Sequence, residues 1–492
     1  MLRVLEMTPG FLAWGTLITL AGLSFSAPAF VALFIIAFDV YWLFKTVYLF
    51  LHLRDSLRKM EENKKIDWLA KLKLECGKEW SGIYHLIIFP MHKEPLEVVR
   101  GSFLNLVKSN YPLEKLIVVL GIEESAGRAA EGTAAKIQNE FGSRFFRFLT
   151  TKHPFGIPGD IPGKGSNETF ASRQAKALII DPQNIPYEDI LVSVFDADTQ
   201  VSPEYFGILT YKFLTSPSPQ RASYQPVPLF LNNIFQAPAL ARIIAFSTTF
   251  WEMIQQSRME QLTTYSSHSM PFKALVEIGF WQKDIVSEDS RIFWQCYLHY
   301  GGDWRVEPLF YPVSMDANAA SSFWQTLINL YRQQRRHAWG VENIPYLLNG
   351  FRRNKKIPKS RKWYWGFTML EGFHSWATNS LIIFFFGWLP IWLGGEVFRG
   401  TVLSYNLPRY SSRIMTIASL FLASLAFFSL VLLPARPPKV KWRQKIFYIF
   451  QWVLMPLTLI VFGALPALEA QTRLMLGGRF RLGFWPTPKS RR

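Results

Sequence analysis

Two carboxylates separated by one residue follow a strongly apolar run near the middle of the chain. The run reads Leu-Val-Ser-Val-Phe-Asp-Ala-Asp-Thr over residues 191–199, which places the carboxylates at Asp196 and Asp198. Hard oxygen ligands at the end of a buried strand suit Mg²⁺ or Mn²⁺, and such ions keep positions open for the phosphate oxygens of a substrate. Since Asp-x-Asp is common, a solvated turn with a capping carboxylate is the simpler interpretation of this motif alone.

A second acidic motif, Val-Ser-Glu-Asp-Ser at 286–290, stands at the expected start of a helix. Carboxylates at a helix start can simply cap the helix and compensate its dipole. The functional interpretation makes Asp289 a general base, because a carboxylate within hydrogen-bond reach can take the proton of an attacking hydroxyl.

A third cluster, at 332–339, combines arginine, glutamine, histidine and tryptophan, and reads Arg-Gln-Gln-Arg-Arg-His-Ala-Trp. Arginine offers paired hydrogen bonds to a diphosphate, and an aromatic ring can stack on a sugar. A basic amphipathic helix at a membrane interface is an equally good interpretation of the cluster by itself.

A Gly/Pro-rich loop over 153–165 precedes a predicted helix over 167–179. Its last residues place Lys164 beside a helix N-terminus, which is a favourable position for binding phosphate. The alternative is a flexible surface loop with one solvated lysine.

These motifs need elements that hold them, and the pattern between residues 84 and 194 predicts an α/β domain. Short apolar runs at 85–89, 116–120, 145–149 and 190–195 are typical of strands, and they alternate with segments of helical periodicity. The helix after the first strand has its buried stripe at Leu96, Val99, Phe103, Leu106 and Val107.

Apolar segments at 11–53, 375–393, 414–433 and 446–466 are each long enough to cross a bilayer. The first is long enough for two crossings, and Ser26-Ala27-Pro28 predicts a break that makes it a helical hairpin. A signal peptide fits less well, because the run continues past a signal's usual length and has no clear cleavage site.

The net charge of +18 is concentrated beside the apolar segments, so it predicts membrane contact and no nucleic-acid partner. Lysine and arginine follow the first hairpin at 54–73 and precede the next apolar segment at 352–362. By the positive-inside rule both junctions, and the domain between them, are predicted to be cytoplasmic. We therefore expect a multi-pass protein of the inner (plasma) membrane.

The three motifs, in this order between apolar segments, resemble the inverting GT-A glycosyltransferases of family 2, especially the membrane-bound cellulose, chitin and hyaluronan synthases. The resemblance implies a Rossmann-like GT-A fold, a metal and a donor diphosphate on Asp196 and Asp198, and Asp289 as the base of the family's Thr-Glu-Asp motif. Further donor contacts are implied at Pro90, Glu94, Glu123, Glu124 and Lys164.

The arginine-rich cluster is similar to the family's Gln-x-x-Arg-Trp signature, with His337 at the tryptophan position. The resemblance implies that Arg336 contacts the donor. It implies acceptor contacts at Gln333, Gln334, His337 and Trp339. The departure at His337 mildly favours transfer of single sugars over polymerisation.

Two further candidates come from the polar loop at 266–270 and from the C-terminal tail. Phe-Trp-Pro-Thr-Pro-Lys at 484–489 is similar to the gating loop of cellulose synthase, which implies nucleotide contacts at Thr487 and Lys489. His268, in Ser-Ser-His-Ser-Met, is a candidate on the acceptor side, although an isolated histidine is more often structural. His92, beside the nucleotide turn, is treated as structural.

The gating-loop interpretation requires a cytosolic C-terminus, whereas three crossings after the domain would place it outside. The basic residues at 436–445 and in the tail both favour the cytosolic side. We therefore expect the last apolar segment, interrupted by Pro456 and Pro466, to be re-entrant or interfacial.

The expected organisation is a hairpin (1–53), a basic linker (54–83), a catalytic domain (84–348), an interfacial segment (349–374), a membrane region (375–470) and a basic tail (471–492). The expected activity is inverting transfer of a sugar from a nucleotide-diphosphate donor to a lipid-linked or polysaccharide acceptor. Membrane lipids are expected partners, and no obligatory protein partner is predicted. The alternative is a transporter or scaffold whose α/β domain binds nucleotides without catalysis.

Overall fold

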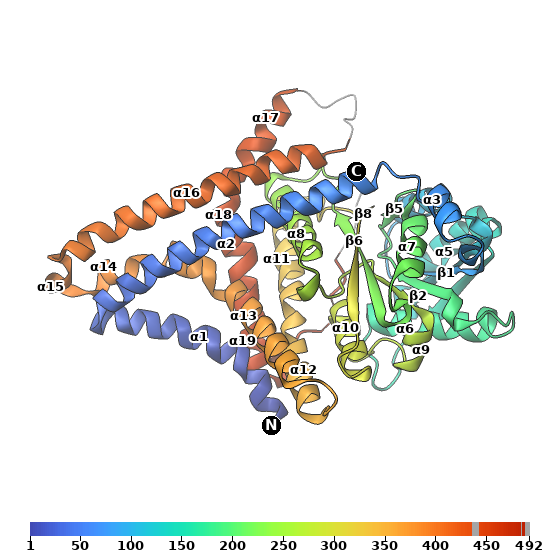
Figure 1. Ribbon diagram of the computed structural model, residues 1–492, viewed down its shortest axis with the longest axis horizontal. Coiled ribbons are helices and arrows are strands. Elements are labelled where there is room, and N and C mark those ends of the chain that lie inside the picture. Colours follow the sequence, from blue (N-terminus) through green and yellow to red (C-terminus); the bar gives the residue numbers. More distant parts are fainter. Residues whose placement is uncertain (435–441, 484, 488–492) are drawn as a thin grey trace. The chain divides into compact units, whose positions relative to one another are not determined.

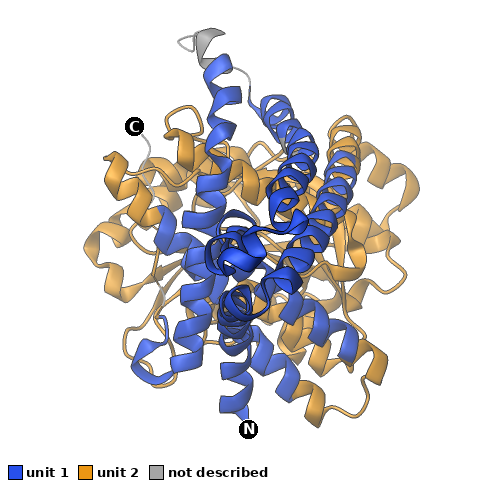
Figure 2. Ribbon diagram, turned by 90° about the vertical axis from the view of Figure 1, so that its left-hand side faces the viewer, with its two compact units in different colours: residues 1–54, 330–349, 363–482 blue, residues 55–329, 350–362, 483–492 orange. Residues whose placement is uncertain are grey.

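A computed structural model describes residues 1–434, 442–483 and 485–487 of the chain. It divides into two compact units, which Figure 2 shows in different colours. Unit 1 contains residues 1–54, 330–349 and 363–482, and unit 2 contains 55–329, 350–362 and 483–492. The predicted gating-loop residue Lys489 and most of the basic segment before the last apolar run lie outside the described residues.

Unit 2 is built on one mixed sheet of eight described strands, in the order β3-β2-β1-β4-β7-β6-β8-β5 (Figure 1). Strands β1 to β4 are parallel to their neighbours within that group, whereas β7 is antiparallel to β4 and β6, and β5 is antiparallel to β8. The strands are β1 (Tyr84–Met91), β2 (Leu116–Glu123), β3 (Arg147–His153), β4 (Ile190–Val194), β5 (Gln200–Val201), β6 (Ala222–Leu229), β7 (Ser269–Pro271) and β8 (Arg305–Ser314).

The predicted strands at 85–89, 116–120 and 190–195 are confirmed as β1, β2 and β4. Every residue of β2 and β4 is buried, as parallel strands covered on both faces require. The prediction at 145–149 was displaced, because β3 begins at Arg147 and runs to His153. As an edge strand with several half-exposed residues, β3 carries a weaker apolar signal than its neighbours.

Helices cover both faces of the sheet in unit 2. α6 packs on β1, β2 and β3, and α8 packs on β6 and β8 (Figure 1). The helices are α3 (Trp68–Glu75), α4 (Leu96–Leu106), α5 (Arg128–Phe141), α6 (Lys164–Ala175), α7 (Tyr205–Thr215), α8 (Ala239–Ser257), α9 (Phe272–Glu277) and α10 (Glu288–His299). The mixed α/β class that the sequence predicted is therefore confirmed.

The core between sheet and helices is rich in aromatic side chains. The ring of Phe89 on β1 contacts Phe103 on α4 and Phe195 after β4, with centroids 5.1 and 5.7 Å apart. Phe103 belongs to the stripe predicted from helical periodicity, and it is fully buried. This packing holds the ends of β1 and β4 in a fixed relation.

Unit 1 is helical over its described residues. Its helices are α1 (Leu2–Ser26), most of α2 (Pro28–Asn63), the end of α11 (Phe323–Ala338), much of α12 (Asn343–Arg353) and α13 (Lys359–Phe384), α14 (Leu389–Leu393), α15 (Gly395–Arg399), α16 (Val402–Leu432), α17 (Trp442–Phe450), α18 (Met455–Thr458) and α19 (Leu465–Leu476). The boundary between α1 and α2 falls at Ala27, where the predicted break lies.

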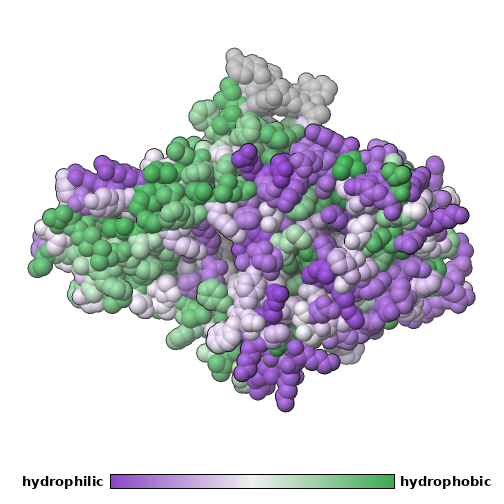
Figure 3. Space-filling view, viewed as in Figure 1, coloured by the Kyte–Doolittle hydropathy of each residue, from purple (hydrophilic) through white to green (hydrophobic). Residues whose placement is uncertain are grey.

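Within the part of the chain that the structure describes, four helical runs are long and apolar enough to cross a membrane: 2–26, 28–63, 402–432 and 446–476. A bent pair, α13 with the segment 386–393, brings the number to five if it forms one span, and its two parts meet at 46°. Exposed apolar side chains gather on α1, α2 and α16, including Phe11, Phe44 and Phe427 (Figure 3). This composition is consistent with membrane association of unit 1.

Candidate active site

The carboxyl ends of β1 and β4 meet at one edge of the sheet, where Asp196 and Asp198 follow β4. The backbone N–H of Phe195 donates to the carbonyl of Ile88, 2.9 Å away, so pairing with β1 continues up to Asp196. The Asp196 side chain is 28% exposed, whereas Asp198 is fully buried. Open parallel sheets bind ligands at this edge.

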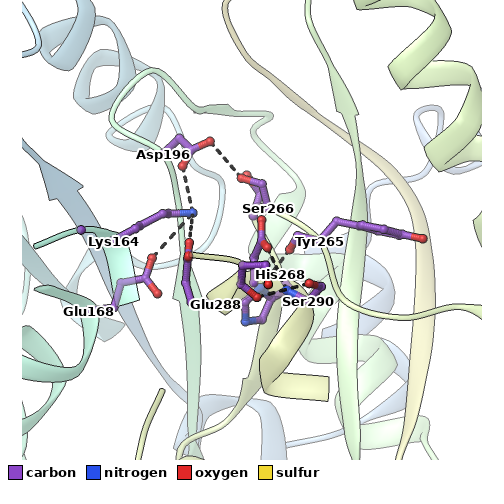
Figure 4. A network of polar contacts seen from close by, with 12 residues as sticks. Lys164, Glu168, Asp196, Tyr265, Ser266, His268, Glu288 and Ser290 are labelled. Carbon is purple, nitrogen blue, oxygen red and sulfur yellow. Dashed lines mark hydrogen bonds and ion pairs between the residues drawn. The ribbon is translucent and has the colours of Figure 1, made fainter. Parts of the chain in front are cut away.

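Lys164 is the first residue of α6, and its amino group lies among three carboxylates (Figure 4). Its Nζ is 2.9 Å from Oδ1 of Asp196, 3.6 Å from Oε1 of Glu168 and 3.9 Å from Oε1 of Glu288. Burial acts to lower the pKa of Lys164, but the carboxylates of Asp196, Glu168, Glu288 and Asp289 outweigh it and hold that pKa well above its ordinary value. The lysine is thus a permanent cation.

The helix predicted over 167–179 starts three residues earlier, at Lys164, which confirms the position of this lysine at a helix N-terminus. The next residue, Gly165, allows α6 to approach the segment before α10. A Cβ at Gly165 would lie 2.9 Å from both the carbonyl oxygen of Gln282 and Cβ of Glu288. The missing side chain of Gly165 therefore lets Glu288 reach Lys164.

Glu168, one turn further along α6, is also part of this cluster. It is 1% exposed, and burial raises its pKa well above the ordinary value, with Glu288, Asp196 and Asp289 raising it further against the opposing effect of Lys164. A carboxyl group that resists ionisation keeps the negative charge around Lys164 lower than the number of acidic residues suggests.

Asp198 anchors the far end of the sheet edge. Its Oδ2 accepts a hydrogen bond from the backbone N–H of Asp316 at 2.9 Å, and its carbonyl accepts one from the Asn232 side chain at 3.0 Å. These bonds tie the end of β4 to the segment after β8 through Asp316 and to the segment after β6 through Asn232. Asp198 is accordingly held by the fold, while Asp196 is the more accessible of the two carboxylates.

Asp196 and Asp198 carry the oxygen ligands that hard divalent cations prefer, and Oδ1 of Asp198 is buried with no hydrogen-bond partner among the described residues. Mg²⁺ is commonly bound through one or two carboxylates together with substrate phosphates. Within the described residues, no group of three or more His, Cys, Asp or Glu side chains is arranged to hold a metal by itself.

The loop between α8 and β7 connects Asp196 with Asp289. The hydroxyl of Ser266 donates to Oδ2 of Asp196 at 2.9 Å, and the hydroxyl of Thr264 donates to the carbonyl of Asp289 at 2.6 Å. Because Thr264 and Ser266 are two residues apart, their Cα atoms are at most about 7.6 Å apart. One short stretch of chain thus contacts the carboxylate of Asp196 and the backbone of Asp289.

Asp289 lies in the first turn of α10 and is partly exposed. Its Oδ1 accepts the backbone N–H of Ser290 at 2.8 Å. This local bond orients the Asp289 carboxylate in the first turn of the helix.

Buried glutamines fix the same loop from the sheet side. Oε1 of Gln225 on β6 accepts the N–H of Tyr265 at 2.9 Å, and its Nε2 donates to the carbonyl of Ser266 at 3.1 Å. Gln256 on α8 donates to the Gln225 carbonyl at 3.1 Å. This chain of bonds restricts the positions of Thr264 and Ser266.

His268 lies in the same loop and is 2% exposed. Its Nδ1 lies 2.9 Å from the carbonyl of Tyr265, which requires the hydrogen to be on Nδ1 and leaves Nε2 as an acceptor. Burial is the main cause that lowers the pKa of His268 to about 4. The hydrogen bond to the Tyr265 carbonyl acts to raise this pKa, and the charge of Lys164 lowers it further. Among the described residues, Nε2 has no hydrogen-bond partner.

The donor residues implied on the first two strands lie at the same sheet edge. Pro90 is half-buried in β1, and the carboxylate of Glu94 accepts the N–H of His92 at 2.7 Å. Glu123, at the end of β2, is 7% exposed and pairs with Nδ1 of His153 at 3.0 Å. Glu124 accepts the N–H of Phe155 at 3.0 Å and is more exposed.

His153 also connects this edge to the Gly/Pro-rich loop. Its Nε2 lies 3.4 Å from Asp160, whose other oxygen is 2.6 Å from Nζ of Lys283. Burial acts to lower the pKa of His153, but Glu123 and Asp160 together raise it above the ordinary value. The loop is therefore held by polar contacts at both of its ends.

The arginine-rich cluster belongs to the helical unit, at the end of α11. His337 is exposed, Gln333 and Arg336 are half-buried, and Gln334 is 9% exposed. Trp339 is 1% exposed and its indole N–H donates to Glu342 at 3.0 Å. This placement leaves Trp339 no free ring face on which a sugar could stack.

Contacts within unit 1 tie the same part of α11 to α19. Glu469 accepts a hydrogen bond from the Tyr331 hydroxyl at 2.8 Å and pairs with Arg335 and Arg473, each at 2.6 Å.

In the tail, Thr487 is 8% exposed, and its hydroxyl has no hydrogen-bond partner among the described residues.

Several residues of the site were missing from the sequence-based predictions: Glu168, Thr264, Ser266, Glu288, Gln225 and Asn232. Glu288 stands inside the acidic motif at 286–290, and Ser266 inside the polar loop, so a signal existed for these two. The others lack a motif, because their places depend on contacts between segments far apart in sequence.

No family model matches the chain, and no curated protein matches it. Among solved structures, the mannosyltransferase PcManGT from Pyrobaculum calidifontis, in complex with GDP-Man and Mn²⁺, is 13% identical with a TM-score of 0.41, covering 86% of this chain and 99% of that one. S. aureus TarS 1–349 in complex with UDP-GlcNAc is 12% identical with a TM-score of 0.38, covering 73% and 95%. TM-scores this low do not establish a shared fold, reaction or substrate.

Proposed function

We propose that the protein is a membrane-bound glycosyltransferase that moves a sugar from a nucleotide-diphosphate donor to a hydroxyl acceptor with inversion. One observation carries the proposal: the loop between α8 and β7 contacts both Asp196 and Asp289. Ser266 binds Asp196 at a phosphate-compatible sheet edge, and Thr264 binds the backbone of Asp289. A cation at a helix N-terminus, Lys164, completes the arrangement.

In the proposed reaction, Asp289 takes the proton of the acceptor hydroxyl as its oxygen attacks the anomeric carbon. A bond forms between this oxygen and the anomeric carbon, while the bond from that carbon to the diphosphate oxygen breaks. The diphosphate leaves with the electron pair, and the configuration at the anomeric carbon inverts. General base assistance of this kind contributes about 10²–10⁴-fold to rate.

Lys164 stabilises the charge that develops on the leaving diphosphate. A fixed cation in a largely buried site is effective because it needs no reorganisation during the reaction. Asp196 and Asp198 would hold Mg²⁺ or Mn²⁺, which supplies additional charge neutralisation at the diphosphate when bound. Asp198 also maintains the sheet edge through its bond to Asp316.

The remaining residues are assigned by position and by the family resemblance. Pro90, Glu94, Glu123 and Glu124 hold the nucleotide at the ends of β1 and β2, and His268 lies on the acceptor side. In the tail, Thr487 and Lys489 are proposed to contact the nucleotide. On α11, Arg336 is proposed to contact the diphosphate. The proposed acceptor contacts on the same helix are Gln333, Gln334 and His337. Trp339 is assigned to the packing of unit 1.

Apolar helices in unit 1 support an acceptor that is itself a lipid, or a polysaccharide extended at a membrane. Basic segments beside these helices favour a cytoplasmic catalytic unit in the inner membrane, in contact with anionic lipids. The predicted domain boundaries remain part of this proposal.

The test uses the full-length protein, purified in detergent and incubated with a panel of UDP- and GDP-sugars, Mn²⁺ and a membrane lipid extract. We expect one donor class to be consumed with release of its nucleoside diphosphate. Asp289→Asn should abolish release while donor-induced thermal stabilisation persists. Asp284→Asn, an exposed neighbour in the same segment, is the matched control and should stay active.

The competing function is a nucleotide-binding transporter or scaffold without catalysis. Donor-induced stabilisation with no nucleoside diphosphate release under any condition would favour that alternative. Near-normal turnover by Asp289→Asn would reject Asp289 as the base while leaving the transferase activity in place.

A further inference from the structure

His153, the last residue of β3, lies between two carboxylates that belong to different segments of unit 2. Its side chain is 3% exposed, and Nδ1 is 3.0 Å from Oε2 of Glu123 on β2. On the other side of the ring, Nε2 is 3.4 Å from Oδ2 of Asp160 in the Gly/Pro-rich loop. A carboxylate accepts hydrogen bonds and has no proton to donate. Both ring nitrogens must therefore donate, and only the doubly protonated imidazolium can do so.

The surroundings of the ring favour this cation. From α6 the ring is met by Phe170, an uncharged aromatic side chain whose centroid is 5.4 Å away. Burial acts to lower the pKa of His153, whereas Glu123 and Asp160 together raise it above its ordinary value. The other charged or titratable side chains linked to these two carboxylates or to the ends of β2 and β3 are His92, Glu124, Glu131, Lys152 and Lys283.

Asp160 transmits the position of the ring to the start of α6. Its Oδ1 is 2.6 Å from Nζ of Lys283, and the backbone N–H of the next residue, Ile161, donates to the Lys283 carbonyl at 2.9 Å. The carbonyl of Ile161 accepts the hydroxyl of Ser166, in the first turn of α6, at 2.8 Å. A displacement of Asp160 would therefore reach Lys164 through a few residues.

The loop at 154–163 depends strongly on such anchors. Three of its ten residues are proline, which has no N–H to donate, and three are glycine, which has no side chain to pack. Gly156 and Gly159 adopt positive φ values of 81° and 83°. The Phe155 side chain is 67% exposed. The contacts of Asp160 thus bear much of the task of holding this loop.

We propose that His153, as an imidazolium, is a positioning residue that holds Glu123 and the loop before Lys164 in one arrangement and releases the loop when it loses a proton. A neutral ring keeps one N–H, so it can donate to only one of the two carboxylates. Its other nitrogen would then direct a lone pair at a carboxylate oxygen. The longer contact, at 3.4 Å to Asp160, is the one that we expect to break.

The inference rests on the proposed function, in which Glu123 contacts the nucleotide and Lys164 contacts the diphosphate. Oε1 of Glu123 is buried with no hydrogen-bond partner among the described residues, and a hydroxyl or N–H of the nucleotide would supply one. His153 therefore couples two donor contacts. Because its pKa is raised in the folded protein, the ring is charged at lower pH, and donor affinity should fall as pH rises through that pKa.

The first experiment observes the loop without any nucleotide. A nitroxide spin label is attached to Phe155→Cys in the full-length protein carrying Cys76→Ser, in which the remaining Cys296 is buried. We expect the mobility of the label to increase between about pH 6 and about pH 9, as the ring loses its proton. A mobility that does not change with pH would overturn the proposal.

Asp160→Asn tests the chemistry of the contact. The amide oxygen can still accept from Lys283, while the amide N–H can donate to the neutral Nε2 of His153. This variant should therefore keep the label immobile at high pH. A wild-type titration in folded Asp160→Asn would contradict the proposal. Asp181→Asn, at an exposed aspartate that pairs with Lys176, is the matched control and should titrate like the wild type.

His153→Gln removes the titrating ring. The folded variant should give a mobile label at every pH in this range, because a neutral amide cannot replace a cation between two carboxylates. A pH-dependent mobility in this variant would assign the effect to another group. The result with Asp160→Asn decides the question if His153→Gln does not fold, because that variant strengthens the contact instead of removing it.

Donor binding is measured next, as the affinity for UDP and GDP with Mn²⁺. Wild-type affinity should fall by about 10-fold or more from pH 6 to pH 9, since a hydrogen bond to a charged group is lost, whereas Asp160→Asn should keep most of its affinity. Equal losses in the two proteins would reject the positioning role. A label that titrates in a protein binding neither nucleotide would reject only the proposed function.

Discussion

The amino group of Lys164 lies 2.9 Å from Oδ1 of Asp196, so the cation and the proposed metal ligand are paired in the absence of a donor. A bound diphosphate would offer Lys164 a second anionic partner. The surrounding carboxylates, Asp196 foremost, hold the pKa of Lys164 well above its ordinary value against the opposing effect of burial, so the lysine stays charged.

Lys164→Met should both destabilise unit 2 and abolish donor binding. Removal of the ammonium group leaves Asp196 and Glu288 without their compensating charge, and loss of one partner of a buried pair costs about 3–5 kcal/mol. Thermal unfolding reports the first effect, and the loss of donor-induced stabilisation reports the second.

The double variant Lys164→Met/Glu168→Gln separates these effects. It removes the buried acidic group that faces Lys164 at 3.6 Å together with the lysine, so part of the stability should return, while donor binding should not. Recovery of donor binding in the double variant would contradict a direct role of Lys164 at the phosphate.

Ser266→Ala should weaken metal-dependent donor binding without unfolding the domain. The variant removes the hydroxyl that orients Asp196, and loss of such an outer contact typically costs about 10–100-fold in metal affinity or activity. Titration of Mn²⁺ into the activity assay should show a higher half-saturating concentration. Ser257→Ala, outside this loop, is the control, and an equal response in both variants would argue against the orienting role.

Gly165→Ala should be destabilising and should reduce turnover. A Cβ at this position would lie 2.9 Å from the Gln282 carbonyl and from Glu288, and overpacking of this kind costs about 1–3 kcal/mol. Displacement of Glu288 would also disturb the charges around Lys164.

Gly132→Ala provides the contrast, because a Cβ on this exposed glycine of α5 would meet no other atom within 4 Å. The substitution should stabilise the helix by about 1 kcal/mol. Comparison of the two melting temperatures separates a steric requirement from general helix propensity, and equal shifts would contradict the close approach at Gly165.

The sequence predicted the elements of this site better than its contacts. β2 and β4 were predictable because unbroken apolar runs are required where both faces of a parallel strand are covered. Lys164 was predictable because glycine and proline mark the end of the loop before α6. The contacts of Ser266 and Thr264 were not predictable, because they join residues 70 and 25 positions apart, and only the folded sheet brings these segments together.

The depressed pKa of His268 should make the folded protein less stable in acid. Its pKa is depressed from 6.5 to about 4 in the folded protein, so the unfolded chain binds the proton more readily. This contribution to stability is fully present above pH 6.5 and is lost as pH falls toward 4. The loss reaches about 2 kcal/mol near pH 5. Thermal unfolding of His268→Gln between pH 7 and 5 should show a weaker pH dependence than the wild type, and an equal dependence would reject this assignment.

The loop that carries Thr264 and Ser266 has an evolutionary consequence. A change in this short stretch that adapts the protein to a new acceptor would also move Asp196, the proposed metal ligand, because the same backbone segment holds Asp196 and the proposed base Asp289. Acceptor preference is then expected to change through substitutions outside this loop. A design that exchanges only the loop should change donor affinity as well as acceptor preference.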